Sequence, residues 1–238
     1  VVDRLPASSN DNEQLAYISR EASTAQVWLY DVKSYSKKQL TQFADHQHYQ
    51  DLQFSPDDTR LSVLMSYGIK LIDVSTGETK LVKLPQQVVR GMSWFDDSTL
   101  AFSLKTEGKW RVHHYSIITE KIALIDEDWA YIKYSKNQKE TAFISQNNEL
   151  YINDNRITTV KFNMIDYNRI FNFQVQDEHL YYRENSPKSL NVIKMHLTSQ
   201  QSELFLESEF PTKLSIVTNG VYYTHIQSHS SDIFRTLK

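Results

Sequence analysis

Short apolar segments separated by polar turns recur along the whole chain. The clearest copy begins with the run 52–54, turns at 55–58 and continues with the segments 61–64, 70–74 and 80–82. Apolar positions in such segments follow a period of two, and Asp, Asn, Ser and Gly fill the turns, as in β-strands joined by tight connections. The pattern predicts an antiparallel meander of four short strands.

This four-strand unit recurs about six times along the sequence. Phe54, Trp94 and Tyr134 follow one another at intervals of forty residues, each just before a polar turn. One such sheet has two apolar faces that it cannot bury alone, whereas copies stacked around an axis bury both faces. A period of about forty residues also matches the blades of a propeller. We therefore predict an all-β fold, a six-bladed β-propeller of four-stranded antiparallel blades.

We assign the chain, residues 1–238, to a single propeller domain whose last blade is incomplete. Residues 3–8 are needed as the inner strand of blade one, so we expect that they do not also complete blade six. That blade is then three-stranded, or is completed by residues beyond this sequence. The predicted blades span about 3–43, 50–84, 90–125, 130–162, 170–206 and 212–238.

The amino-acid composition argues against several classes of function. The 238 residues include no Cys, which excludes disulfides, thiolate metal sites and cysteine nucleophiles. A net charge of −3 without a Lys/Arg run does not favour binding to nucleic acid. No apolar run approaches the roughly 18 residues of a transmembrane helix, so we expect no membrane insertion by this fragment. The chain begins with Val1 and shows no signal-peptide pattern, so we interpret it as a mature fragment or an excised domain.

Two motifs resemble the TolB-type, WD-repeat-like propeller unit: the turn 54–61, Phe-Ser-Pro-Asp-Asp-Thr-Arg-Leu, and the segment 71–81, Leu-Ile-Asp-Val-Ser-Thr-Gly-Glu-Thr-Lys-Leu. Residues 26–32, followed by 39–41, are similar. Asp58 stands where that family favours Gly, which we expect to change the turn locally. Such propellers occur in TolB, in prolyl-oligopeptidase-like enzymes and in the C-terminal extracytoplasmic part of CadC/ToxR-like winged-helix transcriptional regulators. The last setting is what the resemblance favours for a lone propeller.

In a propeller the connections between strands two and three, and between one blade and the next, share one face and are free to bind. Exposed Trp, Tyr and Arg dominate protein interfaces. Alternatively, Trp110 and Trp129 pack beneath the loops as part of the blade core. The candidate binding residues on this loop face are His46, His48, Tyr49, Tyr67, Arg90, Trp110, Trp129, Tyr167, Arg169 and His229.

Catalytic and metal motifs are weak in this sequence. His46 and His48 could hold a metal from one side of an extended segment, but no convincing third ligand accompanies them. His113 and His114 are neighbours in a strand and face opposite ways. The Asp pairs 57–58 and 96–97 occupy equivalent turns, where Asp binds its own backbone. The chain has only five glycines and no Gly-x-Ser-x-Gly elbow. We therefore expect no hydrolase centre, no metal and no cofactor.

We therefore expect a non-enzymatic sensory or protein-interaction domain, the periplasmic part of a membrane-anchored bacterial transcriptional regulator. Its partner would be a protein or a small ligand, bound on the loop face or in the central channel, with no nucleic acid bound by this domain. The alternatives are an accessory propeller that gates a peptidase or other hydrolase, and a propeller that binds a small ligand. The absence of Cys fits a periplasmic and a cytoplasmic location equally.

Overall fold

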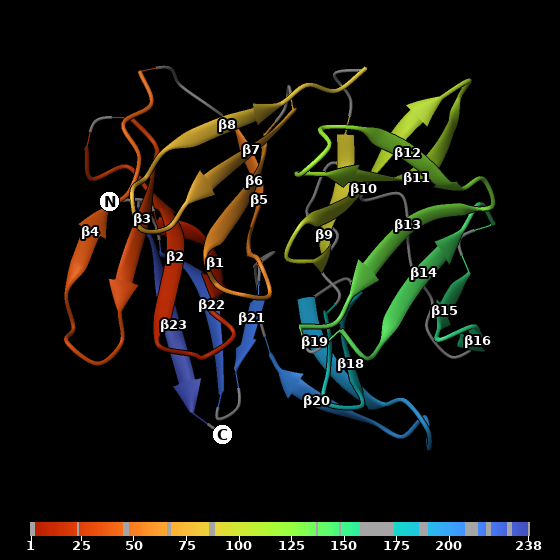
Figure 1. The fold of residues 1–238 in the computed structure, drawn as a ribbon. Helices are drawn as coiled ribbons and strands as arrows, with labels where there is room; N and C mark the ends of the chain where they lie inside the picture. Colours follow the sequence, from red (N-terminus) through yellow and green to blue (C-terminus); the bar gives the residue numbers. More distant parts are fainter. Residues whose placement is uncertain are drawn as a thin grey trace. The chain divides into compact units, whose positions relative to one another are not determined.

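The fold is a β-propeller of six sheets, described here from a computed structural model (Figure 1). Five sheets have four antiparallel strands and the last has three, which confirms the predicted fold class and the incomplete last blade. Within the described part of the chain, no helical segment has the length and apolarity of a membrane crossing. The structure describes residues 3–22, 24–44, 48–65, 68–85, 89–136, 138–147, 149–157, 174–185, 190–207, 214–217, 220–227 and 230–237.

Two compact units make up the chain, and each is described by itself. Unit 1 contains blades one, two and six, within residues 1–85 and 212–238. Strand β1 pairs with β2 as the inner strand of blade one, as predicted for residues 3–8. The strands of unit 1 are β1 (Asp3–Ser8), β2 (Gln14–Ser19), β3 (Gln26–Asp31), β4 (Lys37–Gln39), β5 (Tyr49–Phe54), β6 (Arg60–Met65), β7 (Gly68–Asp73), β8 (Thr79–Val82), β21 (Leu214–Val217), β22 (Gly220–Gln227) and β23 (Ser230–Leu237).

Unit 2 contains blades three, four and five, within residues 86–211. Each of its sheets runs from an inner strand to an outer strand in sequence order. Its strands are β9 (Val89–Asp96), β10 (Thr99–Thr106), β11 (Lys109–Ser116), β12 (Ile122–Asp126), β13 (Trp129–Tyr134), β14 (Thr141–Ser145), β15 (Leu150–Ile152), β16 (Asn155–Ile157), β17 (Gln174–Gln176), β18 (His179–Asn185), β19 (Leu190–His196) and β20 (Ser202–Leu206).

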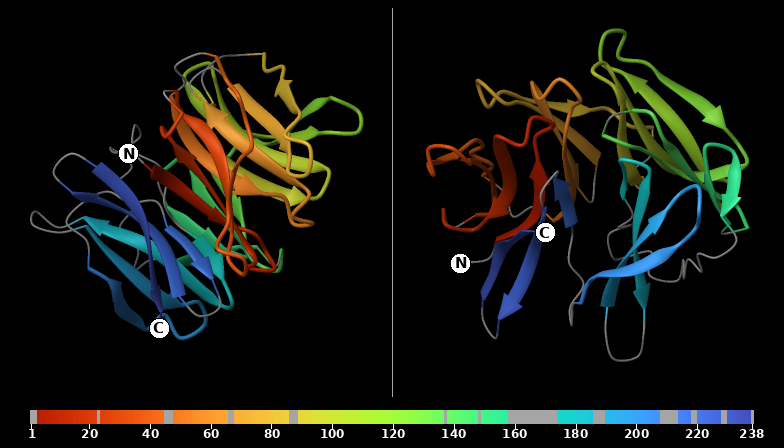
Figure 2. Two further views of the ribbon diagram at one scale, coloured as in Figure 1. Left: turned by 90° about the vertical axis from the view of Figure 1, so that its left-hand side faces the viewer. Right: turned by 90° about the horizontal axis from the view of Figure 1, so that it is seen from below.

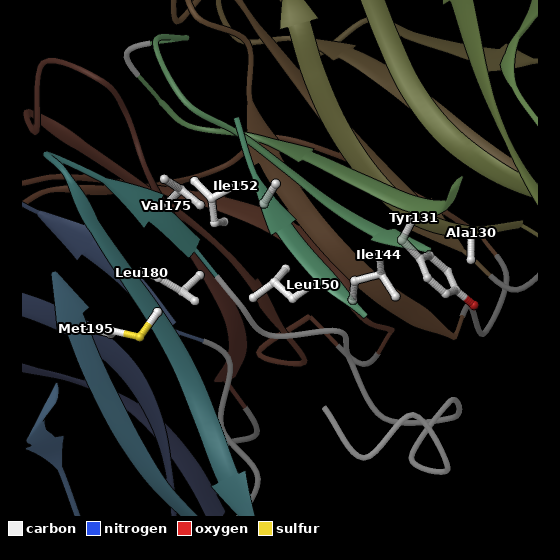
Figure 3. Close-up of a cluster of buried hydrophobic side chains, with 9 residues drawn as sticks. Ala130, Tyr131, Ile144, Leu150, Ile152, Val175, Leu180 and Met195 are labelled. Carbon is white, nitrogen blue, oxygen red and sulfur yellow. The ribbon is translucent and has the colours of Figure 1, made fainter. Parts of the chain in front are cut away.

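Apolar packing between neighbouring sheets forms the core. The second strands β2, β6 and β10 each carry five consecutive buried residues, so successive side chains on both faces of these strands are buried. The outer strands β8 and β12 are mostly exposed. Between blades four and five, side chains of β13–β15 meet those of β17–β19 (Figure 3). The buried members of this cluster are Ala130, Tyr131, Ala142, Ile144, Leu150, Ile152, Val175, Leu180 and Met195.

The residues that mark the repeat occupy the same register in their sheets. Phe54 pairs with Leu61 and Trp94 with Leu100, each on the following strand. In the same way, Tyr134 pairs with Thr141 and Ile216 with Val221. Phe54, Trp94 and Ile216 are 8%, 5% and 3% exposed. The forty-residue spacing therefore reflects equivalent positions at the end of each inner strand.

A buried serine organises the turn after the inner strand in three blades. In blade two the amide of Ser55 donates to the carbonyl of Arg60 over 2.8 Å, and the amide of Arg60 donates to the Ser55 hydroxyl over 2.9 Å. Ser9 and Ser135 make the equivalent bonds in blades one and four. Sequence reasoning recognised Ser55 and Ser135 as turn residues and missed Ser9.

The position three residues after each of these serines is left-handed. Asn12, Asp58 and Gln138 have φ angles of 61°, 58° and 59°. Asp58 thus adopts the conformation that Gly favours, and the expectation that it changes the turn is wrong. Its carboxylate instead accepts hydrogen bonds from the amide and side-chain nitrogens of Asn10, over 2.7 and 2.9 Å, and so joins blade two to blade one.

Acidic side chains cap turns, as the sequence predicted. Asp57 Oδ1 accepts the amide of Thr59 over 3.1 Å, and Asp96 Oδ1 accepts the amide of Ser98 over 2.8 Å. After the third strand, Asp73 accepts the hydroxyl of Ser75, and this bond, with the Thr76 amide, lowers the pKa of Asp73 to about 2. The carboxylates of Asp57, Asp73 and Asp96 therefore accept hydrogen bonds from backbone and hydroxyl groups of their own turns.

Serine side chains also join the inner strands of neighbouring blades. The amide of Ser8 in β1 donates to the Ser215 hydroxyl of blade six over 2.8 Å, and the two buried hydroxyls lie 2.8 Å apart. The amide of Tyr134 in blade four donates to the Ser93 hydroxyl of blade three over 2.9 Å. Figure 2 shows β1 beside the last sheet. A hydroxyl thereby satisfies an inner-strand amide at equivalent points of both units.

Gly77 and Gly108 allow a test of packing between blades one and two. Both have positive φ angles, 77° and 82°, but a Cβ at Gly77 would lie 2.4 Å from the carbonyl oxygen of Leu40, whereas one at Gly108 meets nothing within 4 Å. We expect Gly77→Ala to destabilise the protein by roughly 1–3 kcal/mol more than Gly108→Ala. Both substitutions place a side chain on a residue with a positive φ angle, but only the Cβ at position 77 would clash with a neighbouring atom. Urea denaturation measures the difference; equal losses would contradict the packing of this turn on blade one.

Candidate functional site

Five of the ten predicted binding residues lie in the described part of the chain. Arg90 belongs to β9 and pairs with Ser103 through its backbone. His48 is exposed, beside the start of β5. Trp110 and Trp129 begin β11 and β13. His46, Tyr67, Tyr167, Arg169 and His229 lie outside the described residues.

Tyr49 belongs to the core of unit 1. Its side chain is 2% exposed, and its hydroxyl donates to the carbonyl of Ala25 over 2.8 Å. Its ring also stacks on Phe43 with centroids 6.4 Å apart. On Phe43, the Lys70 ammonium lies 4.1 Å from the ring centroid. Tyr49 therefore ties two loop segments together and does not present its ring to solvent.

Gln26 holds the same loops of unit 1 in place. Its Oε1 accepts the Thr41 hydroxyl over 2.9 Å and the Phe43 amide over 2.8 Å, and its Nε2 donates to the Phe43 carbonyl over 2.8 Å. The residue is 2% exposed. Sequence reasoning missed Gln26, because a glutamine at the start of a strand gives no sign of whether its amide is buried.

Three connections of unit 2 meet at Gln146, and we call them the unit 2 loop cluster: residues 106–110, 126–129, 145–147 and 149. The Gln146 side-chain amide donates to the carbonyl of Trp110 and, over 3.2 Å, to that of Glu127. The Gln146 backbone amide donates to the carbonyl of Asp128 over 3.1 Å. The Gln146 side chain therefore bonds the backbone of both connections that carry the predicted tryptophans, Trp110 and Trp129.

Both tryptophans of this cluster are half-buried. Trp110 lies against Tyr131, with ring centroids 5.9 Å apart. Trp129 stacks on Phe143 at 4.7 Å and meets Tyr151 edge-on at 5.1 Å. Each indole thus packs on the blade core while part of it remains accessible. The sequence left open whether these tryptophans lie at the loop surface or in the blade core. In the structure, one part of each indole packs on the core and another part is exposed.

Charged side chains surround the unit 2 loop cluster. Lys109, Glu127 and Asp128 are exposed. Arg111 directs Nη2 to Glu107 Oε2 over 3.3 Å, at the edge of the same cluster. Half-buried aromatic rings within a rim of mixed charge suit recognition of another macromolecule.

The two neighbouring histidines of β11 serve different contacts. His113 Nδ1 donates to the carbonyl of Arg111 over 2.9 Å, and His114 Nε2 lies 3.1 Å from the Tyr134 hydroxyl in blade four. The exposed ring of Phe95 packs on His114 at 4.9 Å. In the described ranges, no group of three or more His, Asp or Glu side chains is placed to hold a metal ion.

Burial lowers the pKa of His114, although the nearby carboxylate of Asp96 favours the charged ring. Burial likewise lowers the pKa of His113. A lowered pKa means that the unfolded chain binds more protons in the window below its ordinary value of about 6.5. The stability these neutral rings contribute is therefore complete above that pH and is lost as the pH falls toward the folded-state pKa.

We expect the melting temperature to fall between about pH 7 and pH 5, and to fall less in His114→Gln. Glutamine cannot titrate but can still bond the Tyr134 hydroxyl. His48→Gln, at an exposed histidine, is the matched control and should keep the wild-type slope. Thermal unfolding across this range measures all three proteins. If the melting temperature of His114→Gln fell with pH as steeply as that of the wild type, this ring would not couple protonation to folding.

Solved structures share this fold at low sequence identity. TolB from Acinetobacter baumannii is 15% identical with a TM-score of 0.65; the match covers 87% of this chain and 55% of that chain. The β-propeller domain of the Trilobed protease from Pyrococcus furiosus, described as having an open velcro topology, is 13% identical with a TM-score of 0.61, over 98% and 78%. An acylaminoacyl peptidase from Pyrococcus horikoshii is 12% identical with a TM-score of 0.60, over 98% and 43%.

These matches concern the fold. The sequence matches no protein-family model and no curated protein. The chain spans about half the length of the TolB chain that it resembles. Identities of 12–15% carry no substrate, partner or activity from one protein to another. The comparisons and the six sheets together identify a TolB-type β-propeller fold.

Proposed function

We propose that this chain is a non-enzymatic protein-interaction domain that binds a protein partner through the unit 2 loop cluster. The observation that carries the proposal is the position of Gln146, whose amide groups bond the carbonyls of Trp110, Glu127 and Asp128. A binding surface whose backbone is fixed beforehand loses less conformational entropy on association. The half-buried indoles of Trp110 and Trp129 then supply the apolar area at its centre.

The biological setting we favour is sensory. The motifs 54–61 and 71–81 resemble the TolB-type propeller unit, and one setting of that unit is the extracytoplasmic part of CadC/ToxR-like winged-helix regulators. In that setting the propeller is periplasmic, and binding at the unit 2 loop cluster changes the activity of a DNA-binding domain elsewhere in the protein. The flanking sequence tests this directly, since a winged helix and an apolar span should precede the propeller.

A second candidate is an accessory propeller of a peptidase. It is favoured by the similarity to the Trilobed protease propeller and to the acylaminoacyl peptidase, where the match covers 98% of this chain in each case. On this alternative an α/β hydrolase domain should adjoin the propeller, and the loops would control substrate entry. The two candidates thus predict different neighbouring domains in the full-length gene.

The contact itself can be tested by photo-crosslinking in the full-length protein, within its native cells. We expect a crosslinker replacing Lys109, on the unit 2 loop cluster, to capture a defined partner. One replacing Glu78, on an exposed turn of blade two, should not. Gln146→Ala should weaken this capture by roughly five-fold, because the loops lose their fixed backbone. Gln201→Ala, at an exposed turn residue, is the matched control. Capture from the Glu78 position alone would place the binding surface elsewhere.

The non-enzymatic part of the proposal has its own test. We expect the purified chain to show no turnover of ester, peptide or glycoside substrates, because Asp57 and Asp96 are bonded to the backbone of their own turns. Steady-state assays across such panels measure this. Turnover that is abolished by substituting a single Ser, His or Asp of this chain would refute it.

A further inference from the structure

The inner strand of blade one, β1, is irregular just after Arg4. Arg4 pairs with Ile18 of β2. Ala7 pairs with Ala16, so three steps along β1 match only two steps along β2. Within this stretch Leu5 has a φ angle of 57°, a left-handed conformation that is unfavourable for a bulky residue. The two strands therefore pair across a β-bulge, with one extra residue in β1.

The bulge determines which face of blade one carries Arg4. Side chains alternate between the two faces of a regular strand, so without the extra residue Arg4 would share a face with Ser8, whose hydroxyl meets Ser215 of blade six. Paired residues lie on the same face, and the observed register therefore places Arg4 beside Ile18 instead. Tyr49 of blade two lies close enough to influence the charge of Arg4. Arg4 thus lies on the face turned toward blade two.

Arg20 lies close to Arg4 on this face. It follows Ile18 by two positions, directly after the end of β2, and is therefore the diagonal neighbour of Arg4 across the two strands. Diagonal neighbours are about 7–8 Å apart, within reach of long side chains. Burial lowers the pKa of Arg4, and the positive charge of Arg20 lowers it further. The register and the electrostatics thus both place the two guanidinium groups near each other.

No described side chain neutralises these two arginines. Neither guanidinium forms a hydrogen bond or an ion pair within the described part of the chain. Glu21, next to Arg20 in sequence, instead forms an ion pair with Lys37. Arg4 is half-buried, and a charge removed from water without a partner is costly. The pair of arginines is therefore open to a ligand of negative charge.

A phosphate group matches the two guanidinium groups in charge and in hydrogen bonding. Each guanidinium stays protonated at neutral pH and presents its N–H donors in a rigid fork. A phosphate monoester carries about −1.5 to −2 charge at pH 7 and three strong acceptor oxygens, whereas a carboxylate carries a single charge. Two neighbouring positive charges therefore favour a phosphate group over a carboxylate. Arg20 is exposed, so a ligand can reach the pair from solvent.

We propose that Arg4 and Arg20 form a binding site for a phosphate group, carried by inorganic phosphate or by a small phosphate ester. The left-handed Leu5, which is 3% exposed, holds the bulge that brings Arg4 to the same face as Arg20. The site belongs to unit 1 and does not depend on the partner proposed for the unit 2 loop cluster. Loss of phosphate binding would leave partner capture from Lys109 unaffected, and absence of a partner would leave phosphate binding intact.

Isothermal titration calorimetry with inorganic phosphate tests the site. The wild-type chain should bind phosphate saturably at one site, with a Kd of about 1 mM or lower. Arg4→Gln and Arg20→Gln should each weaken this binding by roughly ten-fold or more, because each removes hydrogen bonds between charged groups. Arg60→Gln, at an arginine of β6 that lies beside Asp57, is the matched control and should bind phosphate as the wild type does.

Thermal unfolding distinguishes ligand binding from a purely structural role of the arginines. Phosphate should raise the melting temperature of the wild type, because it binds the folded state, and sodium chloride at the same ionic strength should not. In Arg4→Gln the rise caused by phosphate should be lost. The melting temperature of this variant without phosphate should stay the same or increase, because a half-buried charge next to a like charge has been removed.

Other ligands identify the source of the phosphate group. Phenyl phosphate that binds as tightly as inorganic phosphate would support a site that recognises the terminal phosphate of a larger molecule, whereas weaker binding of the ester would support the free ion as ligand. Acetate that binds as tightly as phosphate would overturn the proposal. So would a wild-type chain without saturable phosphate binding, or Arg4→Gln and Arg20→Gln variants that bind phosphate as the wild type does.

Discussion

Burial of both faces of each small sheet is the constraint on which the rest of this structure depends. The second strands carry five buried residues in a row, which no isolated four-stranded meander could shield from water. Each unit packs three sheets side by side, so that its middle sheet is covered on both faces, and residues at the same point of the repeat close the contacts. Ser215 and Ser93 supply a hydroxyl to an inner-strand amide of the next blade, because a buried amide without a partner would be costly.

Sequence patterns predicted what the repeat imposes on every copy. The spacing of Phe54, Trp94 and Tyr134 located the ends of inner strands. Asp57 and Asp96 were correctly assigned as caps of their own turns, whereas Asp58 bonds Asn10 of blade one. Contacts that occur only once could not be predicted this way. Nothing in the composition distinguishes Gln146, which bonds the backbone of two other connections, from an exposed glutamine such as Gln201. Such roles depend on which loops approach one another in space.

The same limit applies to the residues that were predicted to bind. Aromatic residues on loop connections suggested a binding face, yet Tyr49 is buried and its hydroxyl bonds Ala25, while Trp110 and Trp129 are half-buried on core aromatics. Under the proposed function, these large rings would serve packing and recognition together, since an anchor must itself be held in place. The loops of unit 2 are held in place through Gln146, and exposed charged side chains surround them.

The central claim is that neighbouring sheets of one unit pack face to face, with residues 3–8 as the inner strand of blade one against blade six. The chain has no Cys, so the double variant Ser8→Cys/Ser215→Cys tests this contact directly. The two hydroxyl oxygens lie 2.8 Å apart although 207 positions separate them in sequence. Non-reducing electrophoresis and mass spectrometry should show an intramolecular disulfide, formed on mild oxidation without loss of the folded state. Free thiols under these conditions, or only intermolecular bridges, would contradict the packing of β1 on the last sheet.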